Sequence, residues 1–242
     1  MEKIKFIPSK PKDASSLIII KNDIKKTYVL MGQRSMKSKF MPGVFVFPGG
    51  VREKDDPIAF KFFKLKPNKD ISPKALKSYS NIHCQSLLLT AIRETAEETG
   101  LYLAKKNNNP IKSFVNSNST WNDFTEKSYI PSTNKLFFFG RAITPSTLKI
   151  RFHARFFLAF YNDFLGQIKT NGELDNIGWL SLKEAKRKKI ADVTEFIIDE
   201  IIKLKKNYSG ISHKKKFPMF TWKNNKRWIK WDYVNNSRGI NE

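Results

Sequence analysis

Three glutamates lie within five consecutive positions in the segment Arg93-Glu94-Thr95-Ala96-Glu97-Glu98-Thr99-Gly100-Leu101, in a chain with 45 Lys and Arg against 22 Asp and Glu. On a helix, Glu94, Glu97 and Glu98 stand at i, i+3 and i+4, so their carboxylates project from one face. The only basic side chain between residues 85 and 104 is Arg93. Mg²⁺ binds carboxylate oxygens and substrate phosphates. The cluster therefore predicts a metal-phosphate site, with a solvated acidic face on a surface helix as the alternative.

A second motif lies upstream, where the apolar run Phe45-Val46-Phe47 stops at Pro48-Gly49-Gly50. This pattern is typical of a strand that ends in a tight turn. Together the two motifs resemble the Nudix hydrolases, whose box reads G-x5-E-x7-R-E-U-x-E-E-x-G-U, with U an aliphatic residue. Gly50 would open the box and residues 93 to 101 would close it, with Thr95 in place of the first aliphatic residue.

The two halves of the box are unusually far apart. Gly50 and Arg93 are separated by 43 positions, against 14 in the uninterrupted box, which leaves 29 extra residues. Counting back from Arg93, the position of the isolated box glutamate holds Gln85. That glutamate is therefore absent or displaced into the insert, where the candidate replacements are Glu53, Asp55 and Asp56.

An interrupted box is a feature of the peroxisomal coenzyme A diphosphatase branch of the family and of its bacterial relatives. The chain resembles this branch over about residues 13 to 206, through Phe40 to Gly50, Ile143-Thr144-Pro145, and the segment 151 to 159. The last of these is similar to an Arg-Phe-x-x-Arg-Phe-Phe sequence of the branch. The resemblance implies hydrolysis of coenzyme A or acyl-CoA to 3′,5′-ADP and a 4′-phosphopantetheine product.

The resemblance also implies that the box binds a divalent cation, Mg²⁺ or Mn²⁺. The metal ligands would be Glu94, Glu97 and Glu98, with the Gly50 carbonyl completing the shell. Arg93 would orient a glutamate through its fork of donors, a role that is compatible with an ordinary i,i+4 ion pair with Glu97.

Further candidates lie outside the box. Glu173, ahead of Trp179, occupies a region where many Nudix enzymes keep an extra carboxylate, and it is our general-base candidate, against the alternative of a solvated loop residue. Arginine binds phosphate through two parallel hydrogen bonds. The arginines that we consider for the diphosphate or the 3′-phosphate are Arg34, Arg151 and Arg155.

The resemblance implies an α/β fold, a Nudix-type α/β/α sandwich with a mixed β-sheet and two surface insertions. Apolar, β-branched runs predict strands at 14–20, 27–34, 44–47, 136–143, 150–161 and 179–180. Helical periodicity and capping residues predict helices from about 82 to 99, 120 to 127, 181 to 188 and 193 to 206, with Asn81 capping the first and Gly100 ending it. The insert, about 52–80, should form short helices and loops on the surface. A second embellishment spans about 104–135.

We divide the chain into a Nudix domain, residues 1–206, and a basic aromatic extension, residues 207–242. Two aromatic runs, 217–222 and 227–231, flank Asn224-Asn225, which predicts a hairpin. Its interleaved Lys and Trp could stack nucleic-acid bases, but packing against its own domain is the favoured reading.

Composition bounds the possible partners. The net charge of +23 reflects mostly Lys, spread along the chain with many Asn and Ile, a pattern that an AT-rich genome also produces. The alternatives are steering of a polyanionic small substrate or binding of nucleic acid, which is not favoured. The single Cys84 excludes an internal disulfide. No apolar run approaches the roughly 18 residues of a membrane span and no secretory signal is apparent, so we expect a cytoplasmic protein. These patterns predict no oligomeric state.

Two rival functions stay open. One is hydrolysis of another nucleoside diphosphate derivative, such as an NDP-sugar, a dinucleoside polyphosphate or an oxidised nucleotide. The other is a weakly catalytic Nudix scaffold that binds RNA, a reading supported by Gln85 in place of the box glutamate.

Overall fold

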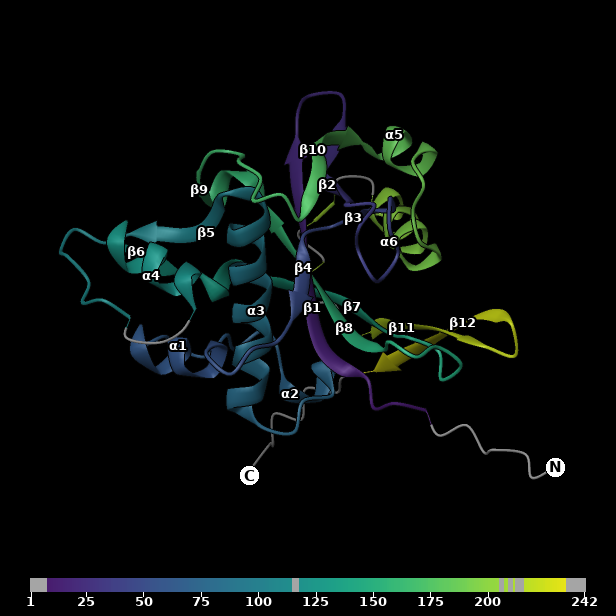
Figure 1. Cartoon of the computed structure of the whole chain (residues 1–242), viewed down its shortest axis with the longest axis horizontal. Helices are drawn as coiled ribbons and strands as arrows, with labels where there is room; N and C mark the ends of the chain where they lie inside the picture. Colours follow the sequence, from purple (N-terminus) through teal and green to yellow (C-terminus); the bar gives the residue numbers. More distant parts are fainter. Residues whose placement is uncertain (1–7, 115–117, 205–206, 209–210, 212–215, 234–242) are drawn as a thin grey trace, which may run out of the picture.

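A mixed nine-stranded sheet forms the centre of the protein in this computed structural model, which describes residues 8–114, 118–204, 207–208, 211 and 216–233. The strand order is β10-β2-β1-β8-β7-β11-β12, with β3 and β4 pairing with β2 and β1 (Figure 1). The β1–β8 and β7–β11 pairs are parallel and the others are antiparallel. The strands are β1 (Lys12–Asn22), β2 (Thr27–Arg34), β3 (Phe45–Val46), β4 (Gly49–Val51), β7 (Phe137–Ile143), β8 (Phe152–Phe160), β10 (Leu174–Ser181), β11 (Lys216–Lys223) and β12 (Lys226–Tyr233).

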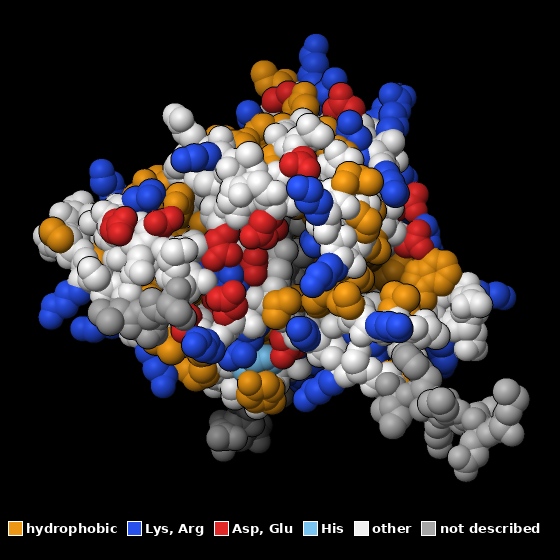
Figure 2. All heavy atoms as spheres, viewed as in Figure 1, with side chains coloured by type: hydrophobic (Ala, Val, Ile, Leu, Met, Phe, Trp, Pro, Cys, Tyr) orange, Lys and Arg blue, Asp and Glu red, His pale blue; other side chains and the backbone are white. Residues whose placement is uncertain are grey.

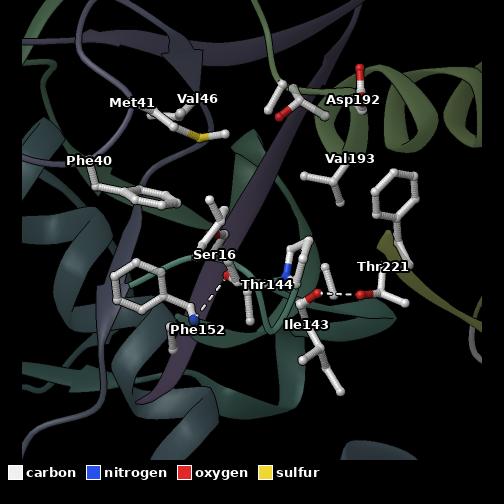
Figure 3. A pocket seen from close by; sticks show the side chains of 18 of the residues that line it. Ser16, Phe40, Met41, Val46, Ile143, Thr144, Phe152, Asp192, Val193 and Thr221 are labelled. Carbon is white, nitrogen blue, oxygen red and sulfur yellow. Dashed lines mark hydrogen bonds between the residues drawn. The ribbon is translucent and has the colours of Figure 1, made fainter. Parts of the chain in front are cut away.

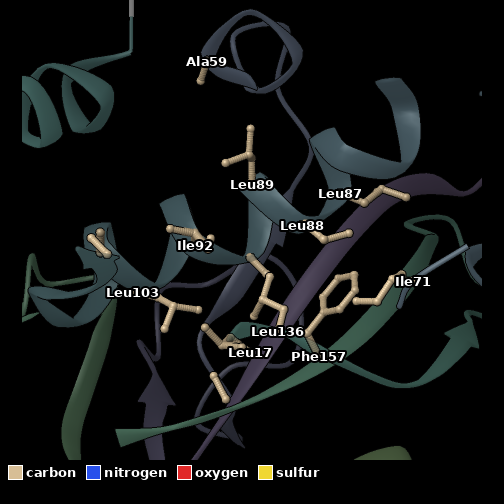
Figure 4. Packing of buried hydrophobic residues seen from close by; sticks show 14 of the residues in the cluster. Leu17, Ala59, Ile71, Leu87, Leu88, Leu89, Ile92, Leu103, Leu136 and Phe157 are labelled. Carbon is tan, nitrogen blue, oxygen red and sulfur yellow. The ribbon is translucent and has the colours of Figure 1, made fainter. Parts of the chain in front are cut away.

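Helices cover both faces of this sheet. One face carries α1 (Asp56–Phe62), α2 (Pro73–Leu76) and α3 (Asn81–Thr99), and the other carries α5 (Leu182–Arg187) and α6 (Asp192–Lys203). Successive side chains of β1 point to opposite faces of the sheet and so contribute to both helical layers. Leu17 and Ile19 pack with α3, while Ile18 and Ile20 pack with α5 and α6. Figure 4 shows the α3 side of this packing. The predicted α/β/α sandwich is confirmed.

Helix α3 is the structural centre of the box. Its first turn is capped by Ser80, whose hydroxyl accepts the His83 N–H at 3.1 Å, so the predicted cap Asn81 is wrong by one residue. Gly100 ends the helix with φ of +69°, as predicted. The helix is buried on nearly all sides, and Glu94 and Glu98 are only 9% and 4% exposed. A solvated acidic face is therefore excluded for these two glutamates.

The insert is part of the main core rather than a surface decoration. Its side chains Phe60, Ile71 and Leu76 are buried in the same cluster as Leu87 and Leu88 of α3. The apolar positions of α1 and α2 are thus used to cover one side of α3. This corrects the expectation that the insert lies only over the surface.

The second embellishment contributes to a small separate sheet, which also includes residues before and after it. Strands β5 (Leu101–Lys106), β6 (Tyr129–Pro131) and β9 (Phe164–Gly166) pair in the order β6-β5-β9, beside α4 (Ser119–Glu126). The helix is predicted from the sequence, but none of the three strands is. Trp121 and Phe124 of α4 are fully buried, so this segment also joins the core.

The C-terminal hairpin is present and extends the central sheet. Asn224 and Asn225 form its turn with positive φ angles of 52° and 57°, which asparagine tolerates. Strand β11 runs parallel to β7 and pairs Phe220 with Ala142. The sheet therefore continues across the boundary that we drew at residue 206. Helix α6 ends at Lys203, before the predicted end, and residues 205–206 lie outside the described part of the chain.

In the part of the chain that the structure describes, no helix has both the length and the apolar character needed to cross a membrane.

Candidate active site

A cavity of about 930 Å³ opens beside the C-terminal half of α3. Its acidic end is lined by Arg34, Gly49, Gly50, Glu94, Glu98 and Glu173. The opposite side is formed by residues 142–148, by the start of α6 (191–194) and by residues 220–225 of the hairpin. Figure 3 shows aromatic and aliphatic side chains, among them Phe40, Phe152 and Val193, that project into the space between. Figure 2 shows acidic side chains gathered over α3 beside a hollow, with Lys or Arg side chains on the facing rim.

The two halves of the box meet at the acidic end. The Gly49 N–H donates to Glu98 Oε2 at 2.8 Å. A Cβ added to Gly50 would lie 2.4 to 2.6 Å from the Glu94 carboxylate, so a residue with a side chain would fit there only if that carboxylate moved. Contact between Gly50 and the box helix, which the interrupted-box reading requires, is therefore confirmed.

Arg93 organises the carboxylates from behind. Its side chain is 1% exposed, and its Nε lies 2.9 Å from Asp56 Oδ1. Its two terminal nitrogens lie 2.9 Å from Glu97 Oε2 and 3.1 Å from Glu94 Oε1. It also donates to the Val51 carbonyl at 2.8 Å. A buried guanidinium requires such pairing, and this pairing fixes the orientation of both glutamates.

Asp56 lies where the spacing from Gly50 places the acid that is missing at Gln85. It is completely buried, and besides Arg93 it accepts hydrogen bonds from Thr90 Oγ1 and from the Glu53 N–H, both at 2.8 Å. Gln85 instead accepts from the backbone N–H of Asn68 in the insert at 3.2 Å. Five residues separate Gly50 from Asp56, which is the spacing of the box, so the insertion follows the acid. Counting forward from Gly50 rather than back from Arg93 would have selected Asp56.

The other two candidate replacements do not occupy this position. Glu53 is half exposed and lies 3.8 Å from Arg93. Asp55 accepts the Asn118 N–H at 3.0 Å, which ties α1 to the start of α4.

The three box glutamates do not share one environment. Glu94 and Glu98 line the cavity, whereas Glu97 does not. Glu97 Oε1 accepts Thr120 Oγ1 at 2.7 Å, while its Oε2 is held by Arg93. Glu97 thus joins α3 to α4 behind the two cavity carboxylates.

Burial makes the cavity carboxylates hard to ionise. Desolvation raises the pKa of Glu94 to about 8, even though Arg93 opposes the shift. Desolvation also raises the pKa of Glu98 well above its usual range, with Glu94 and Glu173 adding repulsion and the Gly49 N–H opposing it. Two buried acids that resist ionisation favour the binding of a cation beside them, because a positive charge would stabilise both carboxylates.

The donor set fits a hard cation. The groups beside the cavity are the carboxylates of Glu94 and Glu98 and the Gly50 backbone, all of which offer oxygen, the element that Mg²⁺ and Mn²⁺ prefer. Among the described residues, no three His, Cys, Asp or Glu side chains are gathered into a metal-binding cluster. Mg²⁺ suits such an arrangement, since it is usually bound by one or two carboxylates together with waters and substrate phosphates.

Glu173 and Arg34 lie at the same end of the cavity. Glu173 directly precedes β10, and its charge acts on Glu98. Arg34, at the end of β2, donates from Nε to the Phe40 carbonyl at 2.8 Å, and its charge lowers the pKa of Glu98. The structure thus brings these two predicted residues to the box.

Arg151 and Arg155 do not line the cavity, so the structure adds no support to their predicted contact with a substrate phosphate. Arg151 donates to the backbone carbonyls of Thr144 at 3.1 Å and Ser9 at 2.6 Å. Arg155 is 1% exposed, forms an ion pair with Asp13 and donates to the Leu76 carbonyl at 3.1 Å.

The physical reason is the alternation of β8. Phe152, Ala154 and Phe156 turn toward the cavity, so Arg155 points to the side of the sheet that carries α3. Alternation correctly separates the two sets of side chains, but by itself it does not tell which set faces a cavity.

The contribution of the hairpin to the cavity is not predicted from the sequence. Residues 220–225 line it because β11 is held beside β7, and a long-range parallel pairing of this kind leaves no local sequence signal.

Comparison with known proteins identifies the fold. The sequence is 25% identical over 186 residues to a protein of Caenorhabditis elegans named putative nudix hydrolase 7. The aligned region covers 74% of this chain and 54% of that protein. The chain thus spans about half the length of this curated relative. The structure superposes on a NUDIX hydrolase from Alicyclobacillus acidocaldarius with a TM-score of 0.66 and 21% identity, over 84% of this chain and 96% of the other. The fold is that of the Nudix hydrolases.

A second Nudix-type structure, a MutT protein from Bacillus halodurans, matches with a TM-score of 0.47 and 14% identity over 91% of this chain and 97% of that one. No family model matches the chain. Residues 50–56 and 93–101, which resemble the two halves of the box, meet in this fold although the insert separates them in the sequence.

Proposed function

We propose that the protein is a divalent-metal-dependent Nudix diphosphohydrolase that cleaves the diphosphate bridge of coenzyme A or an acyl-CoA. The observation that carries the proposal is the pair of buried carboxylates, Glu94 and Glu98, held against Gly49 and Gly50 at one end of a cavity of about 930 Å³. Mg²⁺ or Mn²⁺ would be held by these carboxylates and the Gly50 carbonyl. Glu97, held by Arg93, is the remaining candidate ligand from the box.

Hydrolysis requires a water oxygen to bond to one phosphorus while the bond from that phosphorus to the bridging oxygen breaks. The water gives up a proton, and the departing phosphate keeps the bridging oxygen. Glu173, at the cavity and close enough to act on Glu98, is the proposed acceptor of this proton. A bound divalent ion supplies Lewis-acid stabilisation of the phosphoryl oxygens and acidifies its bound water. Arg34 is the proposed phosphate-binding residue, with its guanidinium fixed by the Phe40 carbonyl.

The lining of the cavity supports a substrate that has an apolar part beyond its diphosphate. Beyond the acidic end, its walls carry Phe40, Phe152, Phe156, Val193 and other apolar side chains. A diphosphate at the acidic end would therefore place the rest of the molecule in apolar surroundings, which suits the pantetheine arm and an acyl chain. Because residues 220–225 of the hairpin line the cavity, we propose that β11 and β12 belong to the Nudix domain and not to a separate extension.

Another nucleoside diphosphate derivative remains the alternative, because the acidic end would accept any diphosphate bridge. The RNA-binding scaffold loses its main support, since Asp56 takes the place of the box glutamate. The cytoplasmic location expected from the sequence stays a prediction.

The test is a substrate panel with Mg²⁺ or Mn²⁺ and with EDTA, analysed by chromatography of the products. CoA and decanoyl-CoA should give 3′,5′-ADP with higher kcat/KM than dephospho-CoA, ADP-ribose, an NDP-sugar or a dinucleoside polyphosphate. An arginine that meets the 3′-phosphate contributes roughly 10- to 100-fold in specificity, so Arg34→Ala should erode the preference for CoA over dephospho-CoA. If another member of the panel has a higher kcat/KM, that compound replaces CoA as the proposed substrate. Absence of metal-dependent turnover of every member would refute the proposed hydrolase activity.

A further inference from the structure

The C-terminal hairpin β11–β12 forms the side of the cavity that faces the box. We propose that Trp222 on this hairpin determines substrate specificity by packing against the apolar group that the substrate carries beyond its diphosphate, an acyl chain or a planar base. This inference rests on the proposed diphosphohydrolase function and extends it to a part of the chain outside the box.

The geometry of β11 directs Trp222 to the cavity. Phe220 and Trp222 lie on one face of the strand, and both line the cavity, as do Thr221, Lys223 and the turn residues Asn224 and Asn225. Across the hairpin, the register pairs Trp222 with Arg227. This face of the hairpin therefore looks toward α6 and the substrate space.

Contacts with both β7 and α6 fix the hairpin against the rest of the fold. Thr221 Oγ1 donates to the Ile143 carbonyl at 2.7 Å, a bond drawn in Figure 3. The ring of Phe220 packs at 5.7 Å from that of Phe196 on α6. Arg227 Nη2 lies 2.9 Å from Asp192 Oδ1 and 2.6 Å from Glu195 Oε2, in the first turn of α6. The hairpin is thus anchored on both β7 and α6, and it presents Trp222 as a fixed wall.

The Trp222 ring takes part in none of these contacts. It is 37% exposed, and among the described residues no ring or cation pairs with it. Trp228 on the same hairpin is 38% exposed but does not line the cavity, and Lys223 Nζ lies over its ring at 5.9 Å. The two tryptophans therefore match in exposure and differ in orientation, which makes Trp228 the control for Trp222.

The experiment compares kcat/KM for two substrate pairs, each with one diphosphate head. Decanoyl-CoA against CoA tests an acyl chain, and diadenosine diphosphate against ADP-ribose tests a second base. Trp222→Ala should lower the preference for the larger member of one pair by about 10-fold, through KM rather than kcat, because aromatic stacking or apolar burial of this size is worth a factor of that order. The pair that changes identifies the apolar group.

Trp222→Phe, which keeps an aromatic face, should restore most of the preference, and Trp228→Ala should leave both ratios within roughly twofold of the unmodified protein. Unchanged ratios in Trp222→Ala, or equal losses in Trp228→Ala, would overturn the inference while leaving the diphosphohydrolase intact. If the unmodified protein hydrolyses no member of either pair, the proposed function fails. The proposed role of Trp222 is then tested by calorimetric titration with decanoyl-CoA in EDTA. Weaker binding by Trp222→Ala than by Trp228→Ala would support this role, and equal binding by the two variants would overturn it.

Discussion

Replacing Asp56 by asparagine should destabilise the protein strongly, although the substitution removes a charge and almost no volume. Asp56 is completely buried and faces a guanidinium that is itself 1% exposed. Breaking a buried ion pair by neutralising one partner costs about 3 to 5 kcal/mol, since the other charge is left uncompensated. Arg93 keeps Glu97 at 2.9 Å and Glu94 at 3.1 Å, so we expect the lower end, about 3 kcal/mol.

The assay is urea unfolding followed by circular dichroism. With a slope of about 2.5 kcal/mol per M, this loss lowers the midpoint by about 1 M. The control is Glu53→Gln, which addresses the same guanidinium from a half-exposed position 3.8 Å away and should cost less than about 1 kcal/mol. Equal midpoints for the two variants would refute the assignment of Asp56 as the buried acid of the box.

Three further predictions concern the site and its surroundings. Glu98→Gln should lower kcat by about 100-fold or more with an unchanged circular dichroism spectrum, because a charged oxygen donor leaves a metal-assisted site; a near-normal rate would rule out Glu98 as a ligand. Gly50→Ala should also lower kcat without unfolding the chain, because its Cβ would lie 2.4 Å from the Glu94 carboxylate, and an unchanged kcat would show that Glu94 moves away at no catalytic cost. Burial and the nearby Arg155 and Arg141 lower the pKa of His153 to about 3, so the unfolded chain binds the extra proton first as the pH falls below about 6.5. Stability should then decrease by up to about 1.4 kcal/mol per pH unit over that window, and His153→Gln should flatten this acid limb in a series of thermal melts, whereas parallel limbs would contradict it.

The neutral state of the His153 imidazole also follows from hydrogen-bond chemistry alone. Arg141 Nη1 lies 3.3 Å from His153 Nε2, and a guanidinium only donates. Nε2 must accept in this contact, so the imidazole is neutral in the folded protein.

Local patterns predicted the parts of the fold that depend on local physics. Helical periodicity and Gly100 located α3 to within one residue at each end, and β-branched runs located β1 and β2. The Asn224-Asn225 turn predicted the hairpin, because few residues adopt the positive φ angles that such a turn needs. The strands of the small sheet were missed, since β6 and β9 are three residues long and their pairing with β5 is long-range.

The candidate site was predicted where spacing along one helix decides geometry. Glu94 and Glu98 reach the cavity as expected from their positions on α3. Glu97 is turned aside by Thr120 of the second embellishment, a partner that no pattern near the box reveals. Arg155 was misplaced because the face of β8 that meets the cavity is chosen by the packing of whole layers.

The position of the insert has a consequence for the order in which the site assembles. Asp56 and Arg93 have 36 residues between them, whereas the uninterrupted box places only seven between its acid and its arginine. Closing the longer loop costs about 1.5 kcal/mol more in chain entropy. Part of that cost is offset by the insert itself, since Ile71 and Leu76 are buried in the core beneath α3. The carboxylate site is therefore a product of long-range collapse, and a peptide spanning α3 alone would lack the arginine geometry that orients its glutamates.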